Sequence, residues 1–153
     1  MLFSGYSEHT IDAKQRLAIP ARYRNRWSQE RDGALWVCLP WPTGHLRLYT
    51  EKYFESLSQP AHPTLTPDRD TAELETRLFS LVEHIEMDSA GRIGLSKRHI
   101  ELAGLQTDVV IAGAGNRLEV HDLSRWKASE DAGFNALPEL VERIQNRNRN
   151  GRE

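Results

Sequence analysis

The chain has 153 residues, of which 39% are hydrophobic and 27% charged, so we expect a folded protein of one or two small domains. A single cysteine, Cys38, excludes an internal disulfide and a thiolate cluster for zinc, and its apolar neighbours predict a buried position. The net charge of −2 argues against a nucleic-acid partner, which usually attracts a basic protein.

The charge is, however, unevenly distributed along the chain. Residues 12–31 contain six basic and two acidic side chains, a net charge of +4. Residues 51–88 contain three basic and nine acidic side chains, a net charge of −6. Because the local potential steers a ligand more than the total charge does, the first segment is a candidate contact for an anionic partner.

The first part of the chain predicts two pairs of strands. Strands are expected over residues 8–11 and 16–19, where alternating apolar residues flank a polar turn, a pattern typical of a hairpin. A short basic helix follows. A second hairpin joins residues 36–39 to residues 46–49, and a short helix comes after it.

The middle of the chain predicts a linker and a helix. Residues 58–66 contain Pro60 and Pro63 and have the composition of a linker. The run Thr66-Pro67-Asp68 predicts the start of a helix, with a cap, a proline in the first turn and an acid near the positive end of the dipole. Its apolar side chains recur at helical spacing and form one face, comprising Leu74, Leu78, Leu81, Val82 and Ile85.

The rest of the chain repeats the order of the first part. Strands are expected over residues 84–87 and 92–95, a helix after Ser96, and a hairpin between residues 109–112 and 118–121. A last amphipathic helix is predicted at about residues 138–145, with an apolar face of Leu137, Leu140, Val141 and Ile144. Residues 146–153 contain no apolar side chain, so we expect a disordered tail.

Two blocks of sequence recur, which indicates an internal duplication. Residues 11–22 align with residues 87–98 at an offset of 76, and residues 45–54 align with residues 117–126 at an offset of 72. The first alignment equates the charged pairs Asp12 and Asp88, Arg16 and Arg92, and Arg22 and Arg98.

In both copies an aspartate ends one strand and an arginine begins the next. The aspartates, Asp12 and Asp88, can accept hydrogen bonds from the backbone two residues on and so define the turn. In the second copy Gly91 tolerates a positive φ. The guanidinium groups of Arg16 and Arg92 suit phosphate or the O6 and N7 atoms of guanine, and a two-stranded ribbon is slim enough to enter a major groove. A plain hairpin with a solvated arginine is the alternative for either turn alone.

Other chemistry has little support in the sequence. The six histidines do not pair at helical spacing and no second cysteine joins them, so we predict no metal site and no cofactor. There is no nucleophile elbow or phosphate loop, so we predict neither an enzyme nor a small-molecule substrate. No segment reaches the ~20 apolar residues that span a bilayer, and the N-terminus lacks the pattern of a secretory signal. We expect a cytoplasmic protein with no membrane partner.

The chain resembles the MraZ family of bacterial transcriptional regulators. The resemblance rests on residues 8–24 and 87–93, and it extends over nearly the whole chain. It implies two SpoVT/AbrB-like swapped-hairpin modules, a homo-oligomeric ring, association with the nucleoid, and binding to promoter repeats of a division and cell-wall gene cluster. It also implies that the basic turns face double-stranded DNA, which points to Lys14, Gln15, Arg16, Gly91 and Arg92.

By charge and position, Arg22 and Arg24 are further candidate phosphate contacts. The chain departs from the usual turn of the family in having Gln15 where glycine is common, so we expect a strained turn if Gln15 has a positive φ. Ala90 takes the place of Lys14 in the second turn, so we expect the first turn to dominate binding.

The predicted fold is mixed β with short α-helices, an α+β fold with a duplicated swapped-hairpin AbrB-like barrel and a pseudo-two-fold within one chain. We expect modules at residues 6–55 and 82–128, separated by residues 56–81 and followed by residues 129–153. The leading functional hypothesis is a sequence-specific DNA-binding transcriptional regulator. The alternative is an antitoxin-like protein-interaction module of the same fold.

Overall fold

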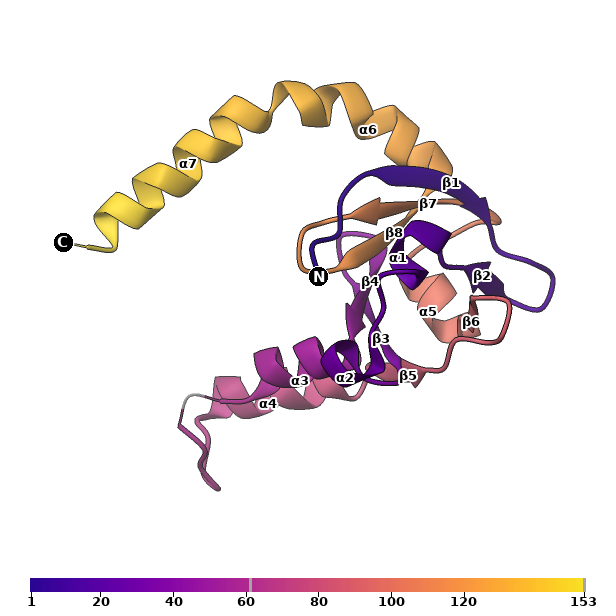
Figure 1. Ribbon diagram of the computed structural model, residues 1–153. Helices are drawn as coiled ribbons and strands as arrows, with labels where there is room; N and C mark the ends of the chain where they lie inside the picture. Colours follow the sequence, from indigo (N-terminus) through magenta and orange to yellow (C-terminus); the bar gives the residue numbers. More distant parts are fainter. Residues whose placement is uncertain (61, 153) are drawn as a thin grey trace. The chain divides into compact units, whose positions relative to one another are not determined.

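The computed structural model describes residues 1–60 and 62–152 and divides into two units, Met1–Leu123 and Ser124–Glu153. The first unit contains both copies of the repeated sequence as far as Leu123. Its main sheet has six antiparallel strands in the order β1-β7-β8-β4-β3-β5 (Figure 1). These strands are β1 (Tyr6–Thr10), β3 (Trp36–Trp41), β4 (His45–Thr50), β5 (Glu83–Ile85), β7 (Asp108–Gly113) and β8 (Leu118–Asp122).

A second, two-stranded sheet pairs β2 (Arg16–Ala18) with β6 (Arg92–Gly94). The helices of this unit are α1 (Ala21–Arg24), α2 (Gln29–Asp32), α3 (Glu51–Ser58), α4 (Arg69–Phe79) and α5 (Lys97–Leu102). This architecture confirms the predicted α+β class.

The strand order confirms the predicted pseudo-two-fold. Exchanging the two modules replaces β1 by β5, β3 by β7 and β4 by β8, and the order of the main sheet then reads the same from the other edge. Leu17 lies opposite Ile93 in the small sheet, and Arg47 lies opposite Glu119 in the main sheet. Each of these pairs joins two positions that the repeat alignment equates, so the axis passes through both sheets.

The strands on either side of each turn pair with the other module. β1 pairs with β7, β5 pairs with β3, and β2 pairs with β6. The local pairing of residues 8–11 with 16–19, and of 84–87 with 92–95, is therefore confined to the turns and one bridge between Met87 and Ile93, and the exchange agrees with the predicted swapped-hairpin fold. In the exchanged arrangement Leu17 and Ile93, the one large apolar side chain of each short strand, are fully buried, which stabilises the pairing.

The core lies between the sheets and the short helices. It includes Trp36, Leu46, Leu48, Val120 and the single cysteine, Cys38, all 0–1% exposed. The prediction that Cys38 is buried is confirmed, and burial raises the pKa of its thiol. The backbone carbonyl of Leu81 accepts a hydrogen bond from Nε2 of the buried His99, whose Nδ1 lies 3.4 Å from the Cys38 Sγ.

Helix α4 differs at both ends from the helix predicted for the middle of the chain. Asp68, rather than Thr66, is its N-cap and accepts a 2.9 Å hydrogen bond from the Thr71 backbone N–H. The helix ends at Phe79, so the predicted apolar face does not continue to Ile85. Ile85 belongs to β5 and pairs with Trp36, because burial in the sheet overrides the helical spacing.

The second unit contains α7 (Leu137–Asn150), preceded by most of α6 (Leu123–Asn135). The tail expected to be disordered from residue 146 is helical to Asn150, so that prediction is wrong for residues 146–150, and its last residue lies outside the described part of the chain. Arginine is a good helix former, and Arg147 and Arg149 lie in the last turn, where cations complement the helix dipole. Among the described residues, no helix combines the length and apolar character needed to cross a membrane.

Candidate nucleic-acid interface

The first turn is organised by Asp12. Its Oδ1 accepts hydrogen bonds from the backbone N–H groups of Lys14 and Arg16, both at 2.9 Å. Its Oδ2 accepts a 2.8 Å hydrogen bond from Nε of Arg16. The backbone closes the turn with a hydrogen bond from the Asp12 N–H to the Arg16 carbonyl at 3.0 Å. One carboxylate therefore shapes the turn and orients its arginine.

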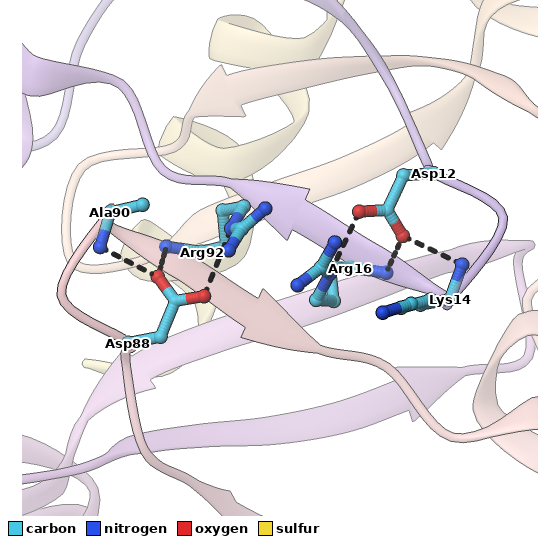
Figure 2. A network of polar contacts seen from close by, with 6 residues as sticks. All are labelled: Asp12, Lys14, Arg16, Asp88, Ala90 and Arg92. Atoms are coloured by element: carbon cyan, nitrogen blue, oxygen red, sulfur yellow. Dashed lines mark hydrogen bonds and ion pairs between the residues drawn. The ribbon is translucent and has the colours of Figure 1, made fainter.

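The second turn repeats this network with the equivalent residues. Oδ1 of Asp88 accepts hydrogen bonds from the backbone N–H groups of Ala90 and Arg92, and its Oδ2 accepts one from Nε of Arg92, all at 2.9 Å. Figure 2 shows the two networks at opposite ends of the β2–β6 pair. The predicted equivalence of the two turns thus extends to their individual hydrogen bonds.

Each turn also holds a strand end of the other module. The carbonyl of Gln15 accepts a 2.8 Å hydrogen bond from the Leu95 N–H, and the carbonyl of Gly91 accepts a 2.9 Å hydrogen bond from the Ile19 N–H. Both acceptor residues have positive φ, 61° for Gln15 and 78° for Gly91. Gln15 is the one non-glycine residue with positive φ in the described part of the chain, so the expected backbone strain at this position is confirmed.

The outer face of the β2–β6 pair combines two arginines with two small residues. Arg16 lies opposite Gly94, and Arg92 lies opposite Ala18. Because side chains alternate along a strand, these four residues share one face, and Leu17 and Ile93 occupy the buried face. Ala18 and Gly94 are exposed, so little stands between this face and a large ligand.

The aspartates orient the arginines without using their whole hydrogen-bonding capacity. Each carboxylate accepts from Nε, so the N–H groups on the two terminal nitrogens are not consumed by this contact. The side chains of Arg16 and Arg92 are 32% and 36% exposed. The arrangement can present a planar, pre-oriented donor fork to phosphate or to a base edge.

Of the two remaining candidate phosphate contacts, Arg24 lies at the turns. Its Nε donates a 2.8 Å hydrogen bond to the carbonyl of Ile19. A Cβ atom on Gly91 would lie 2.5 Å from Cδ and Nε of Arg24, so any other residue there would displace the Arg24 side chain from its position. The guanidinium of Arg22 instead lies beside Gly5 and 4.8 Å from the centroid of the Tyr23 ring.

Hydrogen bonding lowers the pKa of both turn aspartates. For Asp12 the main cause is the backbone N–H of Arg16, assisted by the Arg16 side chain, and Arg92 acts in the same way on Asp88. Both carboxylates are therefore ionised at neutral pH, as the networks require.

One cluster of polar side chains was missed in the sequence. His45, Glu119 and His121 bring donor atoms within 4.8 Å of one another on the adjacent strands β4 and β8. We looked for histidines at helical spacing, whereas this cluster arises from strand pairing. The signal that could have revealed the cluster is the repeat alignment. It places the block that begins at His45 over the block that contains Glu119 and His121.

The fold and the site define a class of protein, a duplicated swapped-hairpin protein with one Asp–Arg turn per module. Comparison with known families agrees with this. Residues 2–73 and 78–147 match a family model described as "MraZ protein, putative antitoxin-like". The chain belongs to the MraZ family.

Relatives of similar length support the same assignment. The chain is 33% identical over 132 residues to the transcriptional regulator MraZ of Nitrosomonas europaea, covering 85% of this chain and 87% of the relative. The protein of the same name from Thioalkalivibrio sulfidiphilus is 31% identical, with 92% and 93% coverage. That of Coxiella burnetii is 32% identical, with 90% and 91% coverage.

We predict that Gln15→Gly raises the free energy of unfolding by roughly 1 kcal/mol, because it removes the cost of a side chain at positive φ. Chemical denaturation of the variant and the parent measures the difference. The matched control is Gly91→Ala, which introduces both the φ penalty and a clash with Arg24 and should destabilise. A lower stability of Gln15→Gly would show that the Gln15 side chain contributes more than its backbone costs.

We also predict a pH dependence of the turns. Because the folded-state pKa values of Asp12 and Asp88 are lowered, both networks contribute stability above the ordinary aspartate pKa of about 3.9 and lose it as the pH falls through the lower folded values. Carboxyl chemical shifts followed by NMR measure these pKa values. In Arg16→Ala the pKa of Asp12 should rise while the pKa of Asp88 stays constant. An unchanged pKa of Asp12 would show that the Arg16 side chain does not lower it.

Proposed function

We propose that this chain is a sequence-specific transcriptional regulator that binds double-stranded DNA through the outer face of the β2–β6 pair. The observation that carries the proposal is the presence of two equivalent Asp–Arg turns on one exposed ribbon. The name of the relatives, transcriptional regulator, supports the same function.

In this proposal the ribbon approaches the major groove with its small residues facing the DNA. A two-stranded ribbon fits this groove, and arginine pairs with guanine O6 and N7 or with phosphate. Arg16 and Arg92 occupy diagonal positions of the ribbon, about 7–8 Å apart, a separation of roughly two base steps at 3.4 Å each. The two arginines can therefore address nearby bases of one site.

The two turns are proposed to contribute unequally. Lys14 adds a flexible cation to the first turn, where the second has Ala90. Gln15 adds an amide, whereas Gly91 adds only its backbone and is covered by Arg24. Arg22, beside Gly5, would reach only phosphates outside the ribbon. We propose that Lys14, Gln15 and Arg16 supply most of the affinity and that Gly91, Arg92 and Arg24 set the orientation.

A homo-oligomer would reconcile the net charge of −2 with DNA binding. Several ribbons that engage repeated sites together multiply weak contacts into a stable complex. We therefore propose a ring-forming, nucleoid-associated cytoplasmic protein whose targets are promoter repeats of a division and cell-wall gene cluster.

DNA binding is tested by fluorescence anisotropy, with the DNA that lies upstream of the gene for this chain as the titrated ligand. Arg16→Ala and Arg92→Ala should each weaken binding at least about fivefold, with the larger loss for Arg16→Ala, because a bidentate base contact contributes about 1–3 kcal/mol. Affinity should also fall steeply with salt, as counterion release requires. The control is Arg77→Ala, an 80% exposed arginine on α4. Parent-like binding by both turn variants would overturn the proposed interface.

The second candidate function, an antitoxin-like protein-interaction module, is favoured by the description of the family and by one surface. Helix α7 exposes an apolar face, and its four side chains, Leu137, Leu140, Val141 and Ile144, are 41–52% exposed. In the regulator proposal this face packs between subunits.

The double variant Leu140→Glu/Ile144→Glu separates these two roles for α7. Light scattering should then report a smaller assembly than that of the parent, with weaker DNA binding, because fewer ribbons engage together. Gln145→Glu adds charge to the same helix outside the apolar face and is the matched control. An unchanged assembly would exclude α7 from the subunit interface and leave its apolar face to another protein.

A further inference from the structure

A second polar site lies in the main sheet, separate from the basic turns. Nε2 of His121 lies 2.9 Å from Oε1 of Glu119, and Nε2 of His45 lies 3.5 Å from Oε2 of the same carboxylate. One donor atom from each of the three residues falls within 4.8 Å of the others. Their side chains are 8%, 14% and 24% exposed for His45, Glu119 and His121. The cluster is thus convergent and largely shielded from water.

The strand pairing near the pseudo-two-fold creates this cluster. His45 lies directly opposite His121 across β4 and β8, and their rings stack with centroids 4.7 Å apart. Glu119 lies two residues before His121 on the same strand, so the alternation of side chains puts all three on one face. Leu46 and Val120 point to the opposite face and are completely buried, which fixes the register.

The hydrogen bonds of His45 leave its Nε2 without a proton. Arginine can only donate, so the 3.2 Å contact from Nε of Arg47 requires Nε2 of His45 to accept. The ring proton then lies on Nδ1, which is 3.3 Å from the hydroxyl oxygen of Thr43. An imidazole with a lone pair facing the cluster and its other nitrogen held by a hydroxyl group has the arrangement of a metal ligand with its outer-sphere partner.

We propose that His45, Glu119 and His121 form a binding site for a divalent transition-metal ion, with zinc the best match. Two imidazoles and one carboxylate match the preferences of zinc, whereas calcium and magnesium prefer oxygen ligands alone. Three protein ligands leave a fourth tetrahedral position for water or for a group from a ligand. A bound ion would cross-link β4 to β8 and so join the two modules at their axis.

Two arginines set the conditions for occupancy. Arg117 donates to Oε2 of Glu119, with Nη2 at 2.7 Å, and Arg47 donates to His45. Both must turn away to admit an ion, and His121 must move its proton from Nε2 to Nδ1. The affinity should therefore be lower than that of preformed structural zinc sites.

Isothermal titration of the full chain with zinc, free of affinity tags, tests the proposal. One zinc ion should bind per chain, and the titration with cobalt should give the intense visible absorption of a four-coordinate ion. His121→Ala and Glu119→Gln should each weaken zinc binding by more than about tenfold, because even the loss of outer-sphere partners commonly costs 10–100-fold. These two positions are preferred to the more buried His45, and circular dichroism verifies that each variant is folded.

Two further variants make the test specific. His62→Ala removes an exposed histidine outside the cluster and should bind zinc as the parent does. Arg117→Ala removes the cation that competes for Glu119 and should tighten binding several-fold. The proposal is overturned if no zinc binds, if His121→Ala and Glu119→Gln bind like the parent, or if His62→Ala abolishes binding, since the ion would then lie elsewhere.

Discussion

The exchange of β2 and β6 between the two modules is the constraint on which the rest of the structure depends. Neither three-residue strand has enough apolar surface to stabilise a hairpin alone, and each pairs with the other module while its one large apolar side chain is fully buried. The carbonyls of Gln15 and Gly91 then bind the far ends of the exchanged strands. A module without its counterpart would lose both its strand partner and the hydrogen bond that the other module donates to its turn.

The same exchange explains why the turns are rigid enough to position arginines. A hairpin tip usually projects from its sheet and moves, because few contacts restrain it. Here each tip is restrained from inside by an aspartate and from outside by the neighbouring module. A pre-oriented arginine loses less side-chain entropy on binding than a free one does, so restraint at the tip favours recognition.

Much of this arrangement could be predicted from the sequence, because local patterns and the repeat encode it. Hydrophobic alternation located the strands, and the alignment of Asp12 with Asp88 indicated equivalent turns. The glycine usual at residue 15 in the family also raised the question of a positive φ, which the structure contains at Gln15. These properties depend on residues close together in the chain.

The errors came from interactions between distant residues. Ile85 fits both the helical spacing and the strand predicted at residues 84–87, and only its pairing with the distant Trp36 decides between them. Arg24 covers Gly91 although the two residues are 67 positions apart in sequence, and His45 meets Glu119 only through the register of two strands.

Fusing the modules in one chain has a further consequence at the axis. In a symmetric dimer of identical modules, the residue at the centre of the sheet would lie opposite the same residue of the other subunit, so an arginine there would face an arginine. In this chain Arg47 lies opposite Glu119, and the repulsion of like charges is avoided. The duplicated chain can therefore place unlike residues where symmetry demands identical ones, and both the unequal turns and the histidine–glutamate cluster depend on that freedom.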